Sequence, residues 1–250
     1  MLSRLRALFR PDTPGFADPA PDEPLAVIGD VHGCDALLGR MLDRIADEAP
    51  GHRIVVAGDM VDRGEDSAGV LRRLVARPDV TCLMGNHELM LLDFLDRPEA
   101  SGTWLRHGGL QTLASYGIAL MAQAPAGRIA QARDALAEAM GPGLIAWLRG
   151  LPSLVESGNV AVVHAGADPR KPLAAQSPEA LAWGAPGFGR IARSDGLWVV
   201  HGHTVVDEAH AEAGRIAIDT GAYATGRLSA VLIDAGGLRF IAETSAGPGR

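Results

Sequence analysis

Three short blocks in the first third of the chain bring together acidic, amide and imidazole side chains. They read GDVHG at 29–33, GDMVDRG at 58–64 and GNHE at 85–88. Each block follows a short apolar run, which predicts a buried strand that ends in a glycine turn. The polar residues should therefore converge at one edge of a sheet.

The residue types in these blocks are those that bind divalent cations. Asp30 and His32 stand two positions apart, so both side chains can leave an extended segment on the same side and bind one cation. Asp59 can bridge two cations with its two carboxylate oxygens. Asn86 offers a neutral amide oxygen to the second cation.

Two histidines further along the chain complete the second cation site. His164 in VVHAG and His203 in VVHGHT again follow apolar runs. Mixed oxygen and imidazole ligands favour manganese, with iron or zinc as alternatives, over calcium. The sequence therefore predicts a cofactor of two divalent metal ions, with Mn²⁺ preferred.

A pair of such ions predicts phosphoester hydrolysis. Two cations roughly 3.5–4 Å apart lower the pKa of a bridging water towards ~7 and bind the phosphate oxygens, so the bridging metal-bound hydroxide attacks directly. His87 is expected to protonate the leaving oxygen. Asp62 is expected to orient His87 and favour its imidazolium, or alternatively to cap the next helix. Arg63 supplies a fork of donors for phosphate.

The order of the motifs carries a family resemblance. GDxHG, GDxVDRG, GNHE, HAG and GHT follow one another over 29–204, and IDTGAYATGRL follows at 218–228. The set resembles the phosphoprotein phosphatase (PPP) family of calcineurin-like metallophosphoesterases, specifically its bacterial serine/threonine phosphatase branch. The resemblance implies an α/β sandwich of two β-sheets flanked by helices, with a helical insertion beside the active site.

The chain departs from that branch at one phosphate-binding position. The branch usually has a Trp-x-Arg element before GHT, whereas here the matching run is WGA, ending at Ala185. Arg190 and Arg193 lie downstream and are candidates to replace the missing arginine. Tyr223 matches a tyrosine that lines the site in the family, so its hydroxyl is a candidate phosphate contact.

The pattern along the chain predicts one catalytic domain. Apolar strands and helices with apolar stripes alternate over 25–96, which implies parallel strand pairing. Helices broken by Gly and Pro fill an insertion at about 97–150. Strands then return and should form a second sheet that packs against the first. The metallophosphoesterase domain is accordingly placed at 25–250.

Composition limits the setting in which the protein works. Residues 1–24 are rich in proline and acid after a short basic piece, which is typical of a flexible tail, and they contain no signal peptide. The formal charge of −7 argues against nucleic-acid binding. No apolar run is long enough to insert stably in a membrane. Two cysteines without a secretion signal indicate a reducing, cytoplasmic setting.

Four histidines and Cys34 are not assigned as metal ligands. His201 is expected to be packed, and His52, His107 and His210 are expected at the surface. Cys34 follows GDVHG at a predicted helix N-terminus, where the pKa of a thiol can be lowered and oxidation could disturb metal binding. Cys34 is nevertheless expected to be a small packed residue, and the reactive thiol is the alternative.

The expected activity is serine/threonine protein phosphatase, with a phosphorylated protein or small phosphoester as substrate. Symmetrical diadenosine tetraphosphate hydrolysis is the alternative, because those enzymes share the GDxHG, GNH and GHT blocks. A catalytically silent metal-binding adaptor is a third possibility of a different class. The sequence does not indicate an oligomeric state.

Overall fold

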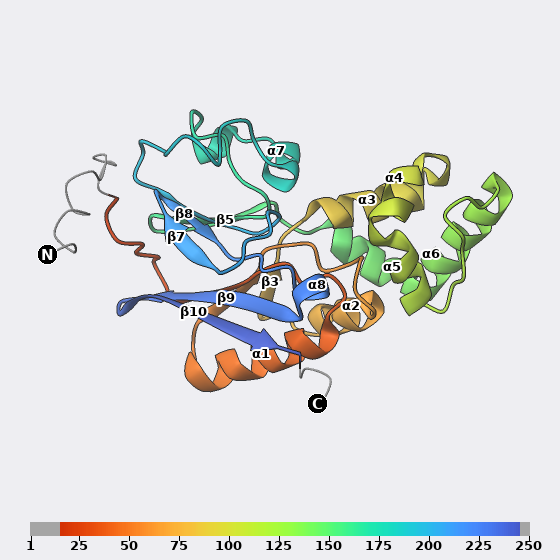
Figure 1. The fold of residues 1–250 in the computed structure, drawn as a ribbon, viewed down its shortest axis with the longest axis horizontal. Coiled ribbons are helices and arrows are strands. Elements are labelled where there is room, and N and C mark those ends of the chain that lie inside the picture. Colours follow the sequence, from red (N-terminus) through yellow and green to blue (C-terminus); the bar gives the residue numbers. More distant parts are fainter. Residues whose placement is uncertain (1–15, 246–250) are drawn as a thin grey trace, which may run out of the picture.

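Short apolar runs become the parallel strands of the first of two five-stranded sheets (Figure 1). The computed structural model describes residues 16–245. Strands β1 (Leu25–Ile28), β2 (Arg53–Val56) and β3 (Val80–Cys82) pair in parallel, as predicted. Helices α1 (Asp35–Glu48) and α2 (Ser67–Val75) make the crossovers between them. The carboxyl ends of the three strands therefore lie at one edge.

The last two strands complete the first sheet, which corrects the sequence prediction. Strand β9 (Arg227–Asp234) pairs antiparallel with β1, and β10 (Gly237–Thr244) pairs with β9. The prediction that these strands belong to the second sheet is wrong. Six consecutive residues of β9 are buried, as suits an inner strand that covers the open edge of β1.

The second sheet has the strand order β4-β5-β6-β8-β7. Its strands are β4 (Leu154–Ser157), β5 (Val160–Val163), β6 (Trp198–His201), β7 (His210–Glu212) and β8 (Arg215–Ala217). The sequence analysis missed β7. All three of its residues are exposed, so the strand carries no apolar signal.

The apolar side chains that alternate along the strands form the contact between the two sheets. The inner cluster takes residues from both: Leu25, Val27, Val55, Val160, Val162, Val200, Ile216 and Val231. On its outer face, the first sheet packs against the apolar stripes of α1 and α2. Helix α7 (Pro178–Trp183) lies beyond the second sheet (Figure 1). The predicted sandwich of two sheets flanked by helices is confirmed.

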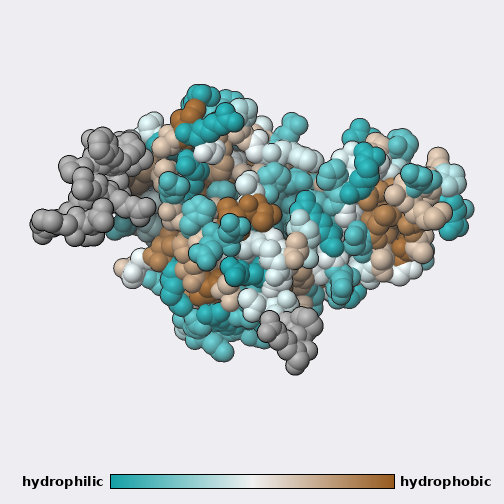
Figure 2. Space-filling model, viewed as in Figure 1, coloured by the Kyte–Doolittle hydropathy of each residue, from teal (hydrophilic) through white to brown (hydrophobic). Residues whose placement is uncertain are grey.

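The segment after β3 is helical and projects to one side of the sheets (Figure 1). Its longest helix, α6, bends at Gly141, whose φ is 73°. Figure 2 shows a mainly hydrophilic face with apolar patches on this insertion and over the sheets. The elements not yet given are α3 (Asn86–Asp96), η1 (Pro98–Ala100), α4 (Gly102–Trp104), η2 (Leu105–Gly109), α5 (Leu110–Ser115), α6 (Ala126–Arg149), η3 (Leu173–Ala175) and α8 (Ala222–Thr225).

None of the helices within 16–245 combines the length and the apolar content that crossing a bilayer requires. The helix with the greatest length, α6, contains Arg128, Arg133, Asp134, Glu138 and Arg149. The prediction of a cytoplasmic setting remains a prediction.

The described part of the expected tail lies against the second sheet. The Trp198 indole Nε1 donates to the Ala17 carbonyl at 2.7 Å. The Ala20 N–H donates to Asn159 Oδ1 at 2.6 Å. Residues 16–24 thus have contacts across the sequence, and the domain boundary at 25 stays a prediction.

We expect residues 16–22 to contribute to stability. A chain that lacks residues 1–22 should have a free energy of unfolding about 1–3 kcal/mol lower than a chain that lacks only residues 1–15, because several hydrogen bonds are lost. Urea denaturation of the two proteins measures the difference. Equal midpoints and slopes would show that the contacts contribute nothing.

Candidate metal centre and active site

The backbone of the motif loops is held in an unusual conformation. A positive φ is uncommon for residues other than glycine and, when it occurs, concentrates at functional sites. In the described chain it is found at His32, Asp59, Asp62, Arg63, His203 and Ala213. All but the last belong to the predicted site, so the strain is concentrated where the motifs meet.

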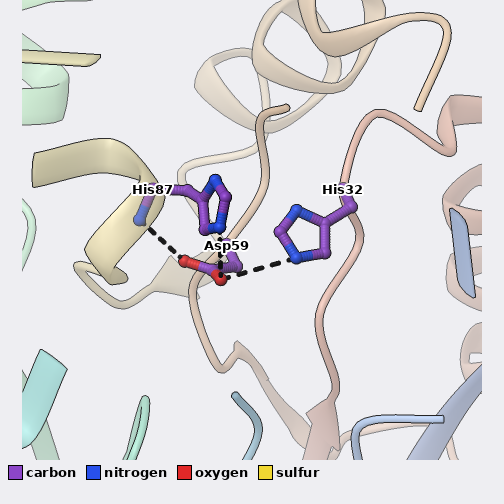
Figure 3. A group of neighbouring side chains, drawn as sticks. All are labelled: His32, Asp59 and His87. Atoms are coloured by element: carbon purple, nitrogen blue, oxygen red, sulfur yellow. Dashed lines mark hydrogen bonds and ion pairs between the residues drawn. The ribbon is translucent and has the colours of Figure 1, made fainter. Parts of the chain in front are cut away.

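Asp59 lies at the centre of the convergent side chains. Its Oδ2 is 3.5 Å from His32 Nε2, and its Oδ1 is 3.3 Å from His164 Nε2. Figure 3 shows Asp59 between His32 and His87. The two carboxylate oxygens therefore face two different histidine groups, which is the arrangement expected of a carboxylate shared by two cations.

A second group of candidate ligands lies around the amide of Asn86, at the start of α3. Its Oδ1 is 3.0 Å from His164 Nε2 and 2.9 Å from His203 Nδ1. Helix α3 begins directly at Asn86, which directs this side chain toward the sheet edge. Three residues distant in the sequence thus present nitrogen and oxygen atoms to one point.

Backbone carbonyls fix which nitrogen of two histidines faces the centre. His32 Nδ1–H donates to the Val61 carbonyl at 2.8 Å, and His164 Nδ1–H donates to the Ala57 carbonyl at 2.9 Å. A carbonyl can only accept, so Nε2 is the nitrogen that each ring turns toward the centre, and it can bind a cation once its proton is lost.

Asp30 provides a second indication of a cation-binding site. Its Oδ2 accepts from the His203 N–H at 3.0 Å, whereas its buried Oδ1 has no hydrogen-bond partner. A buried carboxylate oxygen without a partner is costly, and a cation would satisfy it. Gly202 packs so closely that a Cβ there would lie 1.8 Å from Asp30 Oδ1.

These residues fit a centre of two divalent ions. Two groups of possible ligand atoms are compact, and Asp59 belongs to both: one adds His32 and His87, the other His164 and His203. Asp30 lies outside both groups. All six predicted ligands lie around this centre, and their individual roles remain predictions.

The charges in the centre stabilise one another. Burial would raise the pKa of Asp59, but His164, His87 and His32 outweigh burial and hold that pKa well below its usual value. Burial would lower the pKa of His164, but Asp59 and Asp30 raise it to about 10. Asp59 is therefore an anion across the working pH range.

His87 and Asp62 form a buried pair beside this centre. His87 Nδ1 is 2.6 Å from Asp62 Oδ2, and Arg63 donates to His87 Nε2 at 3.2 Å. Asp62 therefore orients His87 as predicted. The alternative role as a helix cap falls to Asp66, which accepts from the Gly69 N–H at the start of α2.

The protonation state of this pair differs from the sequence expectation. Burial lowers the pKa of His87 to about 4, although Asp59 opposes the shift. Burial also raises the pKa of Asp62 well above its usual value. Burial thus acts against the imidazolium that Asp62 is expected to favour, and the catalytic role of the pair remains a prediction.

Two residues of the insertion hold Asp62, and sequence reasoning missed both. The Trp104 indole Nε1 donates to Asp62 Oδ2 at 2.9 Å, and the Thr112 hydroxyl donates to Asp62 Oδ1 at 2.6 Å. No spacing rule predicts these bonds, since they join residues across the fold. The helical insertion is therefore connected to the pair formed by His87 and Asp62.

The candidates for phosphate binding lie at different distances from the centre. Arg63 Cζ lies 4.8 Å from the centre of the Tyr223 ring, so Tyr223 borders the site. Arg193 is buried and paired with Asp195, so it cannot reach the centre. Arg190 is exposed and does not line the cavity beside the centre.

The remaining histidines lie outside the centre. His201 is buried with its ring 4.9 Å from that of Phe188, as expected of a packed residue. His107 and His210 are exposed. His52 is wrongly predicted as a surface residue, because only 10% of its side chain is exposed.

Comparison with known proteins places this site in a family. Residues 23–207 match the profile of the calcineurin-like phosphoesterases. The chain belongs to the calcineurin-like phosphoesterase family. It is a metallophosphoesterase, and the family implies a phosphoester substrate.

Its curated relatives have two kinds of name. Bis(5'-nucleosyl)-tetraphosphatases, symmetrical, match at 45% identity over 69 residues in Paracidovorax citrulli and at 32% over 154 residues in Aromatoleum aromaticum. Serine/threonine-protein phosphatase 1 of Salmonella typhimurium matches at 39% over 84 residues. The alignments cover 27%, 59% and 33% of this chain but only 25%, 48% and 38% of those relatives.

Solved structures show the same fold. One named as a candidate diadenosine tetraphosphatase has a TM-score of 0.65 and 23% identity, covering 90% of this chain and 95% of its own. A protein serine/threonine phosphatase from Saccharomyces cerevisiae has a TM-score of 0.56 and 17% identity, covering 92% and 82%.

Glu88 organises the metal-centre loops without facing a cation. Its carboxylate accepts from the backbone N–H groups of Asp59, Met60, Val61 and Gly85 at 2.9, 2.8, 3.2 and 3.0 Å. The residue is fully buried. Its place in GNHE was the available signal, but sequence reasoning assigned it no role.

We expect Glu88→Gln to destabilise the protein by about 3 kcal/mol, because an amide cannot accept all four bonds and one of its own donors then meets a backbone N–H. Urea denaturation measures this loss. The exposed Glu99→Gln is the matched control and should remain within about 0.5 kcal/mol of the parent. Equal stability of both variants would remove Glu88 from this role.

Cys34 does not have the reactive character that its helix position suggested. Burial, together with the nearby Glu65, raises the pKa of its thiol to about 11. Burial similarly raises the pKa of Cys82 to about 12. The structure supports the expectation that Cys34 is a packed residue.

Alkylation of Cys34 by iodoacetamide should be slow. At about pH 8, its rate should be at least about tenfold below that of a free thiol, since little thiolate is present. Mass spectrometry of the modified peptide gives the rate, and Cys34→Ser isolates any reaction of Cys82. A rate that reaches a plateau below about pH 8 would contradict the raised pKa.

Proposed function

We propose that this protein hydrolyses dinucleoside tetraphosphates symmetrically. The observation that carries the proposal is a pair of cavities, each of about 600 Å³, one of which borders a predicted ligand directly and the other through Tyr223. One is lined by His203 and the other by Tyr223, whose ring contacts His32. A substrate cut at its middle needs room for an arm on each side.

The curated relatives support the same choice. The name symmetrical bis(5'-nucleosyl)-tetraphosphatase recurs among them, including the match that covers 59% of this chain. The similarity therefore favours the dinucleotide over the protein-phosphatase activity that the sequence motifs first suggested. Breaking the central P–O–P link with one water gives two identical nucleoside diphosphates.

The residues around the centre suit this reaction. Asp59, Asn86 and the histidines would hold two divalent cations, which supply Lewis acidity and an activated water when bound. Arg63, beside His87, presents its guanidinium to the phosphate oxygens. A nucleoside diphosphate leaves as a stabilised anion, so the reaction depends less on a proton from His87 than ester cleavage does.

Protein phosphatase activity remains the second candidate. The 2.6 Å contact between His87 and Asp62 is the observation that favours it, because it orients His87 at the centre, where ester cleavage needs a proton donor for the serine or threonine alkoxide. Burial, which lowers the pKa of His87, opposes this role. The similarity to serine/threonine-protein phosphatase 1 points the same way.

Initial rates with manganese, measured in parallel on diadenosine tetraphosphate and on a phosphothreonine peptide, test the proposal. We expect kcat/KM to be at least about tenfold higher for the dinucleotide, with nucleoside diphosphate as the sole product, because both arms find a cavity. Asp59→Asn should lose nearly all activity on both substrates.

Preference for the peptide would replace the proposal with the second candidate. A manganese titration that yields no activity on either substrate would instead support a silent metal-binding adaptor.

A further inference from the structure

A cavity of about 600 Å³ extends from His203 along the outer side of the second sheet. Its walls come from the end of α7, the loop that follows α7, and strands β6 to β8. It contains Ala185, the position where the phosphate-binding arginine of the related branch is missing. The residues that line this cavity suggest what fills it.

Trp183 gives the cavity a flat apolar wall. It is the last residue of α7, and its side chain is 46% exposed. Few large apolar side chains of the described chain are exposed to that degree, because burial of an indole is strongly favourable. An exposed indole at the mouth of a cavity suits stacking with a nucleobase.

Arg215 gives the same cavity a cation. It lies on β8 and faces the cavity together with Ala217 and His201, in the alternation expected along neighbouring strands. Among the ion pairs within 16–245, none includes Arg215. Its fork of donors is therefore available to phosphate oxygens.

Arg215 is thus the arginine in the lining of the cavity that contains Ala185. Ala185 cannot supply the charge, Arg193 is held by Asp195, and Arg190 lies outside the cavity lining. The charge comes from the opposite wall of the same cavity. Glu212, which is paired with Arg215 in the strand register, adds an acceptor suited to ribose hydroxyls.

The cavity on the other side of the centre has a different charge. It is lined by Tyr223 together with Asp35, Glu65 and Asp66. Carboxylates repel a polyphosphate, so this cavity is less suited to the more charged part of a nucleotide. The two arms of the substrate would therefore be held unequally.

We propose that the cavity beside His203 is a nucleotide subsite, in which Trp183 stacks on the base and Arg215 contacts the phosphates that lead to the metal centre. The choice of a nucleotide rests on the proposed function. The subsite holds one arm of the substrate and supplies the phosphate contact that is absent at Ala185.

Binding separates this subsite from the reaction itself. Isothermal titration of the manganese-loaded protein uses α,β-methylene-ADP, which resists cleavage, and methylenediphosphonate, which lacks the nucleoside. Trp183→Ala should weaken α,β-methylene-ADP at least about fivefold and leave methylenediphosphonate unchanged, because only the former stacks. Arg215→Ala should weaken both about tenfold, and Arg215→Lys should restore part of the loss.

Matched controls lie on the insertion. Met121→Ala removes another exposed apolar side chain, and Arg128→Ala another exposed arginine, and both should bind the two ligands like the parent. Trp183→Phe keeps a ring and should retain most of the affinity for α,β-methylene-ADP. Circular dichroism verifies that each variant is folded.

The outcomes distinguish the subsite from the proposed activity. Equal affinity of the parent and Trp183→Ala for α,β-methylene-ADP would overturn the stacking role. Loss of affinity in Arg190→Ala but not in Arg215→Ala would overturn the assignment of the phosphate contact. If Trp183→Ala and Arg215→Ala lose affinity as expected but the parent does not cleave diadenosine tetraphosphate, the subsite is supported and the proposed function is wrong.

Discussion

The buried carboxylate of Asp59 is the constraint on which the rest of the structure depends. An isolated anion in this position would be strongly destabilising, but histidines from three separate segments of the chain surround it. Its own backbone takes a positive φ, and Glu88 holds the adjacent N–H groups. The strained loop is therefore stabilised from within the protein and presents two oxygens toward two ligand groups.

The helical insertion also stabilises the pair formed by Asp62 and His87. Trp104 and Thr112 donate to Asp62, which in turn orients His87. The insertion, whose sequence predicts a separate helical unit, thus helps to hold the His87 ring at the centre. Its influence on activity acts through the position of Asp62 as well as through access to the site.

The choice of substrate depends on the cavities around the metal centre, because the centre itself suits more than one phosphoester. The ligand arrangement and Arg63 suit hydrolysis of either a phosphoprotein or a dinucleotide, since both present a phosphate to two cations. The cavities differ from one member of a fold to another and therefore carry the selectivity. Here Trp183 and Arg215 give one cavity a stacking surface and a cation, which together match a nucleotide better than an extended peptide.

The sequence by itself determined the strand-turn pattern of the motifs and the residue types of the centre, because ligand chemistry and short-range periodicity are local properties. It predicted the parallel core of β1, β2 and β3 correctly, but only tertiary structure decided that β9 closes the edge of β1. The bonds from Trp104 to Asp62 and the placement of Arg215 in the same cavity as Ala185 likewise depend on how distant segments pack. Such contacts have no fixed spacing in the chain, so no local pattern reveals them.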